Sequence, residues 1–316
     1  MSKPILEPDA LTPLLEREYD LTPPITCELI RRGFNDHYRV RSGGESAILR
    51  VYLHGKYYIA STADFRFELE LLDFLARRGV SVAHPLPRRD GSLLGTTDSE
   101  TGGRASALFT TAAGKEADPL TPEQARSLGE TVGAFHVTAN QFHSPHRRYH
   151  LDLESLLDRP LREMEALFRQ REREGLQLYR PMVAELRRRV CETEVAGDGY
   201  GIIHGDLHGR NFHFTEAGGP TLFDFDHGGF GWRAYDLAVC RLCLSEQAWG
   251  AFLETYQSVR AISDTELALI PTFARIRRIW DTGDILAMHA VWGDEPDATA
   301  CDEILEMLEQ VSRADG

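Results

Sequence analysis

Residues 204–226 read HGDLHGRNFHFTEAGGPTLFDFD, and this stretch decides between two classes of fold. His204 and His208 are four residues apart with a carboxylate between them, a spacing that presents two zinc-binding imidazoles on one turn of a helix. Alternatively, Asp206 and Asn211 follow His204 with the spacing of a phosphoryl-transfer loop. The two interpretations need different local structures, so the residues on either side of the motif distinguish between them.

The neighbouring residues favour a loop between two strands. YGII before the motif is a short apolar, β-prone run, and NFHF at its end is a second one. Gly205 and Gly209 would each weaken a helix by about 1 kcal/mol. No Glu follows His204 directly, where a zinc hydrolase would carry its general base. The zinc alternative therefore needs a helix that these residues do not favour, and metal analysis of the purified protein would test it.

Phosphoryl transfer asks a protein for positioning, metal charge and a base for the attacking hydroxyl. Asp206 would accept the hydroxyl proton, and Asn211 would offer a neutral oxygen to Mg²⁺, which prefers oxygen ligands. The run GGPTLFDFD supplies a second carboxylate, Asp224, after a turn and an apolar strand. Asp226, expected on the same strand face, would be a further ligand or only a hydrogen-bonding neighbour. The order H-x-D-L-x-x-x-N and then D-F-D favours phosphoryl transfer over a hairpin of solvated acids.

The pattern along the chain predicts two parts. ITCELIRR, HYRVR and SAILRVY are β-prone runs separated by glycine-containing turns, and ADFRFELELLDFLARRG has helical spacing and ends at Gly79. Residues 80–91 and RASALFTTAAG add strand-like segments. Thr121 and Pro122 then begin a helix, and helices continue to the end except for the insert around residues 200–232. We therefore expect an α+β protein with an N-terminal lobe at 1–112 and a helical lobe at 113–316.

Composition excludes several classes of function. The formal charge of −14 argues against a nucleic-acid surface, which needs a basic stripe. An acidic field would attract a cationic partner, although acidity also simply keeps a protein in solution. MSKPILEPDA lacks a signal peptide's apolar region, and no apolar run approaches the roughly 20 residues that span a bilayer. We expect a cytoplasmic protein without a membrane segment, and we assign the five cysteines no chemistry.

With these residues assembled, the chain resembles the aminoglycoside phosphotransferase-like kinases, a family with the protein-kinase-like fold that includes choline, homoserine and stress-response kinases. HGDLHGRN followed by LFDFDHGGFGWRAYDLA is similar to the family signature nearly throughout. GFNDHYRV, AILRVY, ELELLDFL, ALFTTAAG and LGETVGAFH occur in the family's order, so the resemblance covers about residues 25–245. It implies a bilobal kinase-like fold with a small antiparallel-sheet lobe, a larger helical lobe, and ATP and Mg²⁺ as cofactors.

The resemblance also implies roles for individual residues. Asp206 would be the catalytic base, and Asn211 and Asp224 would hold Mg²⁺. A strand–helix ion pair would hold the α- and β-phosphates, the turn at residues 33–35 would cover the phosphates, and backbone at residues 110–112 would receive adenine. The ion pair would be Arg50 and Glu68. Gly33 and Asn35 would be the nucleotide-binding residues of the turn, and Thr110 and Ala112 those at the adenine. His204 and Asp236 would support the loop.

The chain departs from the family pattern at two places. Arg50 stands where the strand residue is usually Lys, which keeps the charge but replaces an ammonium by a planar guanidinium. GFND is not a G-x-G-x-x-G loop, so a glycine-rich phosphate cradle is not indicated. Arg50 taken alone would be read as a solvated strand residue, and Glu68 competes with Asp64 and Glu70 for its role.

Acceptor recognition is less defined by the sequence. Asp226, His208, Trp232 and Tyr235 are candidate substrate-binding residues, although His208 equally suits a loop hydrogen bond and the two aromatic residues equally suit a core. Residues 280–296 could form an acceptor wall. The predicted function is transfer of the ATP γ-phosphate to a small-molecule hydroxyl, with an aminoglycoside-like or amino-alcohol acceptor that an acidic protein would attract. A serine/threonine protein kinase of the stress-response type and a non-catalytic ATP-binding pseudokinase are the alternatives.

Overall fold

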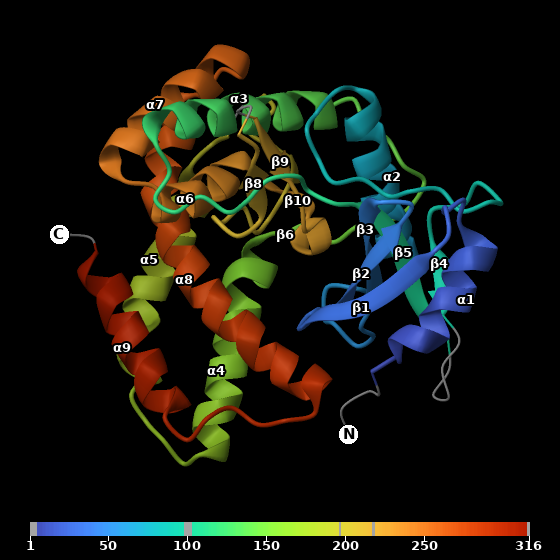
Figure 1. The fold of residues 1–316 in the computed structure, drawn as a ribbon. Helices are drawn as coiled ribbons and strands as arrows, with labels where there is room; N and C mark the ends of the chain where they lie inside the picture. Colours follow the sequence, from blue (N-terminus) through green and yellow to red (C-terminus); the bar gives the residue numbers. More distant parts are fainter. Residues whose placement is uncertain (1–4, 98–102, 196, 217–218, 315–316) are drawn as a thin grey trace.

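The computed structural model describes residues 5–97, 103–195, 197–216 and 219–314. A five-stranded sheet with two helices lies at one end of the molecule, and helices make up most of the other end (Figure 1). This arrangement confirms the predicted α+β, kinase-like architecture. The N-terminal elements are α1 Pro8–Glu18, β1 Ile25–Arg32, β2 Asn35–Ser42, β3 Glu45–Tyr52, α2 Thr62–Arg77, β4 Gly95–Thr97 and β5 Arg104–Thr110.

The N-terminal sheet is antiparallel throughout, with the strand order β1-β2-β3-β5-β4. The three predicted β-prone runs coincide with β1, β2 and β3. Tyr38 and Val40 of β2 and Leu49 and Val51 of β3 are fully buried, because alternate residues of a strand face the same side of the sheet. They pack in one cluster with Leu15 of α1, a helix that was not among the predicted elements.

Helix α2 follows the prediction from the sequence. Ser61 caps its N-terminus in a capping box with Asp64, and the helix ends at Arg77, just before Gly79. Residues 80–91, expected to be strand-like, instead form isolated bridges, Val82 with Leu222 and Pro85 with Phe109. The prolines in this segment have no N–H to donate to a ladder, which explains the difference.

The C-terminal part begins with α3, where Thr121 is the N-cap as the sequence indicated; the structure adds a capping box between Thr121 and Gln124. A Cβ at Gly129 would lie 2.2 Å from the Phe252 carbonyl oxygen, so glycine is required for the close packing of α3 on α7. The elements are α3 Pro122–Ala139, β6 His150–Leu151, η1 Glu154–Asp158, α4 Arg159–Gln170, η2 Leu176–Tyr179, α5 Arg180–Glu192, β7 Tyr200–Ile203, β8 Phe212–Phe214, β9 Pro220–Leu222, η3 Phe225–His227, β10 Gly229–Trp232, α6 Arg233–Cys243, α7 Glu246–Val259, α8 Asp264–Trp292 and α9 Ala300–Arg313.

The non-helical insert lies within this helical part, as predicted. Strands β6, β10 and β7 form one small sheet, and β8 pairs with β9 in another. The expectation that Asp224 and Asp226 share a strand face is wrong. β9 ends at Leu222, Asp224 adopts a left-handed conformation with φ 64°, and Phe225–His227 form a 3₁₀ turn that sends the two carboxylates in different directions.

One apolar core crosses from the N-terminal to the C-terminal part. Phe65 and Leu72 of α2 belong to the same cluster of buried residues as Phe135 of α3 and Phe225 of the insert. The expected boundary between residues 112 and 113 falls in the connection between β5 and α3. The division into two domains there stays a prediction. None of the helices in the described residues combines the length and apolar character needed to cross a membrane.

Candidate active site

The motif HGDLHGRN connects β7 to β8 as a loop and not as a helix. His204 is fully buried, and its Nε2 donates to the carbonyl oxygen of Phe223 at 2.9 Å. His208 instead lines a cavity, where its Nε2 lies 3.4 Å from Asp206 Oδ2. The zinc alternative required His204 and His208 to lie on one continuous helix, and the structure has a loop at these residues.

Buried hydrogen bonds fix the start of this loop. Asp236, in the first turn of α6, accepts from the backbone N–H of His204 at 2.7 Å and of Gly205 at 2.8 Å. The side chain of His136 from α3 lies 3.1 Å from the same carboxylate. Gly205 has φ 77°, and a Cβ there would lie 2.4 Å from the carbonyl oxygen of His227. A side chain at this position would therefore meet backbone that cannot move aside easily.

Asp206 is held by three side chains. The Asn211 Nδ2 donates to Asp206 Oδ2 at 3.0 Å, Arg277 Nη2 donates to Oδ1 at 2.5 Å, and His208 lies on the Oδ2 side. Burial would raise the pKa of Asp206, but the Arg277 guanidinium and His208 outweigh it and hold that pKa well below its ordinary value. Asp206 is consequently a carboxylate at neutral pH.

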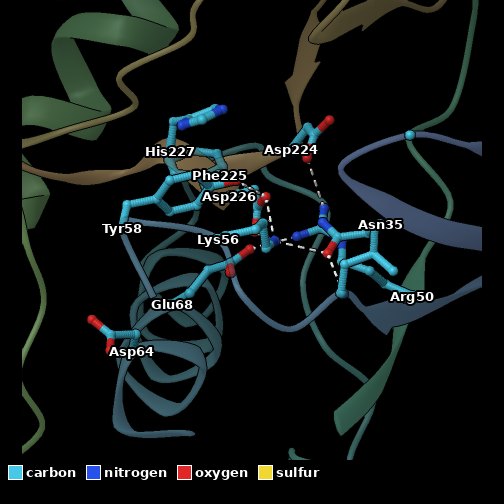
Figure 2. Close-up of polar contacts among 12 residues, drawn as sticks. Asn35, Arg50, Lys56, Tyr58, Asp64, Glu68, Asp224, Phe225, Asp226 and His227 are labelled. Atoms are coloured by element: carbon cyan, nitrogen blue, oxygen red, sulfur yellow. Dashed lines mark hydrogen bonds and ion pairs between the residues drawn. The ribbon is translucent and has the colours of Figure 1, made fainter. Parts of the chain in front are cut away.

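Arg50 joins the N-terminal sheet to helix α2 and to the DFD segment (Figure 2). Its Nη1 donates to Glu68 Oε1 at 2.7 Å, and its Nη2 donates to Asp224 Oδ1 at 3.2 Å. Arg50 is therefore a buried ion-pair residue and not a solvated strand residue. The two rivals of Glu68 have other contacts, since Asp64 caps α2 and Glu70 accepts from Ser144. The expected strand–helix ion pair is thus Arg50–Glu68.

Asp226 has surroundings unlike those of Asp224. Lys56 Nζ lies 2.9 Å and 2.7 Å from its two carboxylate oxygens, and Tyr58 Oη donates to Oδ2 at 2.7 Å (Figure 2). Lys56 also donates to Asn35 Oδ1 at 2.9 Å. Asp224 keeps about a quarter of its side chain exposed, whereas Asp226 is buried. The buried charge of Asp226 is thus neutralised by Lys56 before any ligand arrives.

Two cavities meet at this centre. The first, of about 440 Å³, is called the acidic cavity because its five Asp side chains outnumber its three Arg side chains; the Asp residues are Asp206, Asp224, Asp226, Asp281 and Asp284, and the Arg residues are Arg31, Arg210 and Arg277. The second, of about 260 Å³, lies between Ile48 and Arg50 of the sheet and Phe223 of the insert. Asp224 lines both cavities, so it stands where a ligand that spans them would pass.

The other predicted nucleotide residues are distributed over both cavities. Thr110 and Ala112 line the smaller one. The Gly33 carbonyl oxygen accepts from Trp292 Nε1 at 3.1 Å, which ties the β1–β2 turn to the end of α8. Asn35 lines the acidic cavity, but its side-chain oxygen is engaged by Lys56. Phe34 is thus the residue of the turn that gives the cavity an apolar wall, and Gly33 does not line it.

The two aromatic candidates lie away from the cavities. Tyr235 is fully buried and packs edge-on against Phe273, and Trp232 packs on Phe273 and Tyr200. Neither lines either cavity. The apolar environment at the start of α6 accounts for this placement, since large rings there contribute most by filling the core. Of the expected acceptor wall at 280–296, the residues at the acidic cavity are Trp280, Asp281, Asp284 and Ile285.

Sequence reasoning missed three residues at this site: Lys56, Tyr57 and Arg277. The rarity of lysine could have drawn attention to Lys56, because only three of the 35 Lys and Arg residues are Lys. Arg277 and Asp281 are four apart on α8, a spacing that predicts an ordinary surface pair. Their partners Asp206, Asp226 and Asp284 are far away in the sequence, so spacing alone could not indicate the contacts.

Comparison with known proteins agrees with the kinase-like fold. The structure superposes on that of an amicoumacin kinase, hAmiN, in complex with AMP-PNP, Ca²⁺ and Ami, with a TM-score of 0.76, 19% identity, and 98% and 94% of the two chains covered. A microcompartment-associated aminopropanol kinase gives a TM-score of 0.72 with 24% identity, and 97% and 96% of the chains are covered. At these identities the likeness establishes the fold alone.

Sequence comparison establishes the family. Residues 26–269 match the family described as the phosphotransferase enzyme family, and the chain belongs to it. An uncharacterized protein of Deinococcus radiodurans is 38% identical over 302 residues, covering 92% of this chain and 85% of that one. A homoserine kinase of Rhizobium rhizogenes is 28% identical over 273 residues, covering 82% and 79%. The protein is therefore an enzyme of the phosphotransferase class.

Proposed function

We propose that this enzyme transfers the γ-phosphate of ATP to a hydroxyl group of a small, amine-bearing acceptor. The observation that carries the proposal is the position of Asp206, an ionised carboxylate on the wall of an acidic cavity that shares Asp224 with a second, more apolar cavity. This arrangement supports one cavity for the acceptor and one for the nucleotide, with the reacting groups between them.

The smaller cavity suits the nucleotide. Ile48, Leu72, Phe109 and Phe223 give it apolar walls for a flat base, and Thr110, Thr111 and Ala112 also line it. Arg50 lines the same cavity towards Asp224, where phosphates would lie. A guanidinium can bind phosphate oxygens in a bidentate manner, so Arg50 can replace the usual lysine.

The residues around Asp224 fit a divalent cation. Asn211 Nδ2 donates to two oxygens of Asp206, an orientation in which its amide oxygen is the atom left to bind a ligand. Together with Asp224 it forms a set of hard oxygen donors, as Mg²⁺ prefers. Bound Mg²⁺ would neutralise charge on the transferring phosphoryl group. Asp226 is not part of this set, because Lys56 and Tyr58 occupy its oxygens.

Asp206 would act as the base. The acceptor oxygen forms the new bond to the γ-phosphorus while the bond to the ADP oxygen breaks, and the hydroxyl proton passes to Asp206. The low pKa of Asp206 keeps it ionised at neutral pH, so its oxygens are free of a proton when the acceptor binds. Retention of Asp206, Asn211 and Asp224 around one cavity supports catalysis over the pseudokinase alternative.

The acidic cavity supports a cationic acceptor. The five Asp side chains that line it outnumber its three Arg side chains, so a positive group on the acceptor would lower the cost of gathering these charges. The homoserine kinase and the aminopropanol kinase found by comparison are named for amine-bearing alcohols, which accords with this chemistry.

The test is acceptor-stimulated release of ADP from ATP and Mg²⁺, measured with wild-type protein and with Asp206→Asn. Homoserine, aminopropanol, choline, spectinomycin, aminoglycosides and a generic protein substrate make up the panel. Stimulation by an amine-bearing small molecule, lost by 10²–10⁴-fold in Asp206→Asn while ATP still binds, is the expected result. Stimulation by the protein substrate alone would instead favour the stress-response type of kinase, and undiminished turnover in Asp206→Asn would reject the mechanism.

A further inference from the structure

The loop between β3 and α2 reaches from the N-terminal sheet to the acceptor side of the site. Three consecutive side chains in it contact carboxylates from distant parts of the chain. Lys56 and Tyr58 hold Asp226, whereas Tyr57 Oη donates to Asp284 Oδ1 on α8 at 2.7 Å (Figure 2 draws the Asp226 contacts). The loop therefore does more than connect two elements of the N-terminal lobe.

Asp284 differs from the other carboxylates at the acidic cavity. Arg277 pairs with Asp206 and Asp281, Arg50 with Asp224, and Lys56 with Asp226. Each of those four carboxylates has an Arg or Lys partner within 3.2 Å. Asp284, by contrast, has no Arg or Lys ion pair among the described residues, and its hydrogen-bond donor is the neutral hydroxyl of Tyr57. Its other oxygen lies 3.7 Å from His227 Nε2, beyond hydrogen-bond distance.

The electrostatics of Asp284 follow from these contacts. Burial raises the pKa of Asp284 although His227, the hydrogen bond from Tyr57 and the more distant Arg159 guanidinium all act to lower it, whereas the pKa of Asp206 beside Arg277 is lowered. Burial also raises the pKa of Tyr57 well above its ordinary value, so its hydroxyl stays protonated and remains a donor. An ammonium group arriving from the cavity would therefore supply the counter-charge that Asp284 lacks.

Tyr57 is itself held in place from two sides. The guanidinium of Arg159 lies 3.4 Å from the centre of its ring, and Arg159 Nη1 is 3.4 Å from the carbonyl oxygen of Gly283, the residue before Asp284. Tyr57 does not line the acidic cavity, whereas Asp284 and His227 do. The Tyr57 hydroxyl thus binds Asp284 Oδ1 from outside the cavity, and Asp284 Oδ2 is left for a ligand in the cavity.

We propose that Asp284 binds the ammonium group of the acceptor and that Tyr57, from the N-terminal lobe, is the positioning residue that orients this carboxylate. The inference rests on the proposed function and deepens it by assigning the acceptor's cation to one carboxylate. It makes the β3–α2 loop a determinant of acceptor specificity, although the loop belongs to the lobe that binds the nucleotide.

The test is calorimetric titration of the intact protein with 1-amino-2-propanol and with its uncharged counterpart 1,2-propanediol, in the presence of AMP-PNP and Mg²⁺. Wild-type protein is expected to bind the amine at least tenfold more tightly. Asp284→Asn should abolish that preference. Tyr57→Phe should weaken amine binding by roughly tenfold or more, the effect of one hydrogen bond to a charged group, with nucleotide affinity changed less than twofold.

Tyr58→Phe is the matched control, because it removes the same hydroxyl from the neighbouring residue but acts on Asp226. Amine affinity within twofold of wild type is expected for it. Tyr57→Phe should add no further loss in an Asp284→Asn background. Additive losses, equal effects of Tyr57→Phe and Tyr58→Phe, or failure of wild-type protein to prefer the amine would overturn the inference. None of these results would reject phosphoryl transfer, which acceptor-stimulated ADP release measures separately.

Discussion

Arg277, on the long helix α8, grips the loop of Asp206 at two points. Its Nη2 lies 2.5 Å from Asp206 Oδ1, and its Nη1 lies 3.1 Å from the carbonyl oxygen of Gly205. Arg277 is buried, and Asp281 one turn further along the helix shares its charge at 2.7 Å. The proposed base is therefore oriented by a helix that begins almost sixty residues after it.

Replacement of Arg277 by Met should make the enzyme sensitive to acid. Asp206 must be ionised to accept a proton, and its depressed pKa keeps it ionised at neutral and mildly acidic pH. Loss of Arg277 removes the largest of the influences that oppose burial, so the pKa of Asp206 should rise from its wild-type value. The acid limb of kcat/KM should then move to higher pH in Arg277→Met. The neighbouring Arg278→Met, an exposed position, is the control, and an unchanged pH profile in Arg277→Met would contradict the role given to this contact.

Substitution by alanine should destabilise the protein at one glycine of HGDLHGRN and not at the other. Gly205→Ala would place a Cβ 2.4 Å from the His227 carbonyl oxygen in a left-handed conformation, whereas nothing lies within 4 Å of a Cβ at Gly209. Gly205→Ala should lower the free energy of unfolding by more than about 1 kcal/mol and reduce kcat. Gly209→Ala should leave the free energy of unfolding nearly unchanged. Thermal and denaturant unfolding of the two variants test this directly, and equal stability would refute it.

The Lys56–Asp226 pair should contribute to stability chiefly by avoiding an unpaired charge. Lys56→Met leaves Asp226 buried without its counter-ion, at a cost of about 3–5 kcal/mol. The double variant Lys56→Met, Asp226→Asn removes both charges and should recover a large part of that loss. Denaturant unfolding of the two single variants and the double variant measures the coupling. A double variant as unstable as the sum of the single variants would show that the two residues act independently.

Arg50→Lys should weaken nucleotide binding although it keeps the charge. The guanidinium reaches Glu68 and Asp224 at once, and one ammonium group cannot reproduce both contacts in the same geometry. We expect KM for MgATP to rise on the order of tenfold, the effect of one charge-assisted hydrogen bond. Arg41→Lys, on the exposed part of β2, is the matched control. A lysine variant with wild-type KM would show that position 50 needs only a positive charge.

Several parts of the site could be predicted because their signals are local. The loop conformation of HGDLHGRN follows from its glycines and the short β-prone runs on either side, and the Thr121 capping box lies within four residues. Asp206, Asn211 and Asp224 line one cavity because a short hairpin brings them together. Trp232 and Tyr235 lie elsewhere, since an aromatic side chain gives no local sign of whether it faces a core or a ligand.

The sequence by itself determined strands β1 to β3, the starts of helices α2 and α3 and the loop at Asp206, because alternation, capping and turn residues act over a few positions. The motif HGDLHGRN followed by DFD indicated the class of enzyme. Only the tertiary structure decided which charges meet. Arg50 reaches Asp224, Lys56 reaches Asp226, Tyr57 reaches Asp284 and Arg277 reaches Asp206 across separations of 71 to 227 residues. Such pairs depend on how the buried faces of distant elements pack. Burial removes the water that would otherwise solvate each charge, so each charge must be stabilised by the protein group that packs nearest to it.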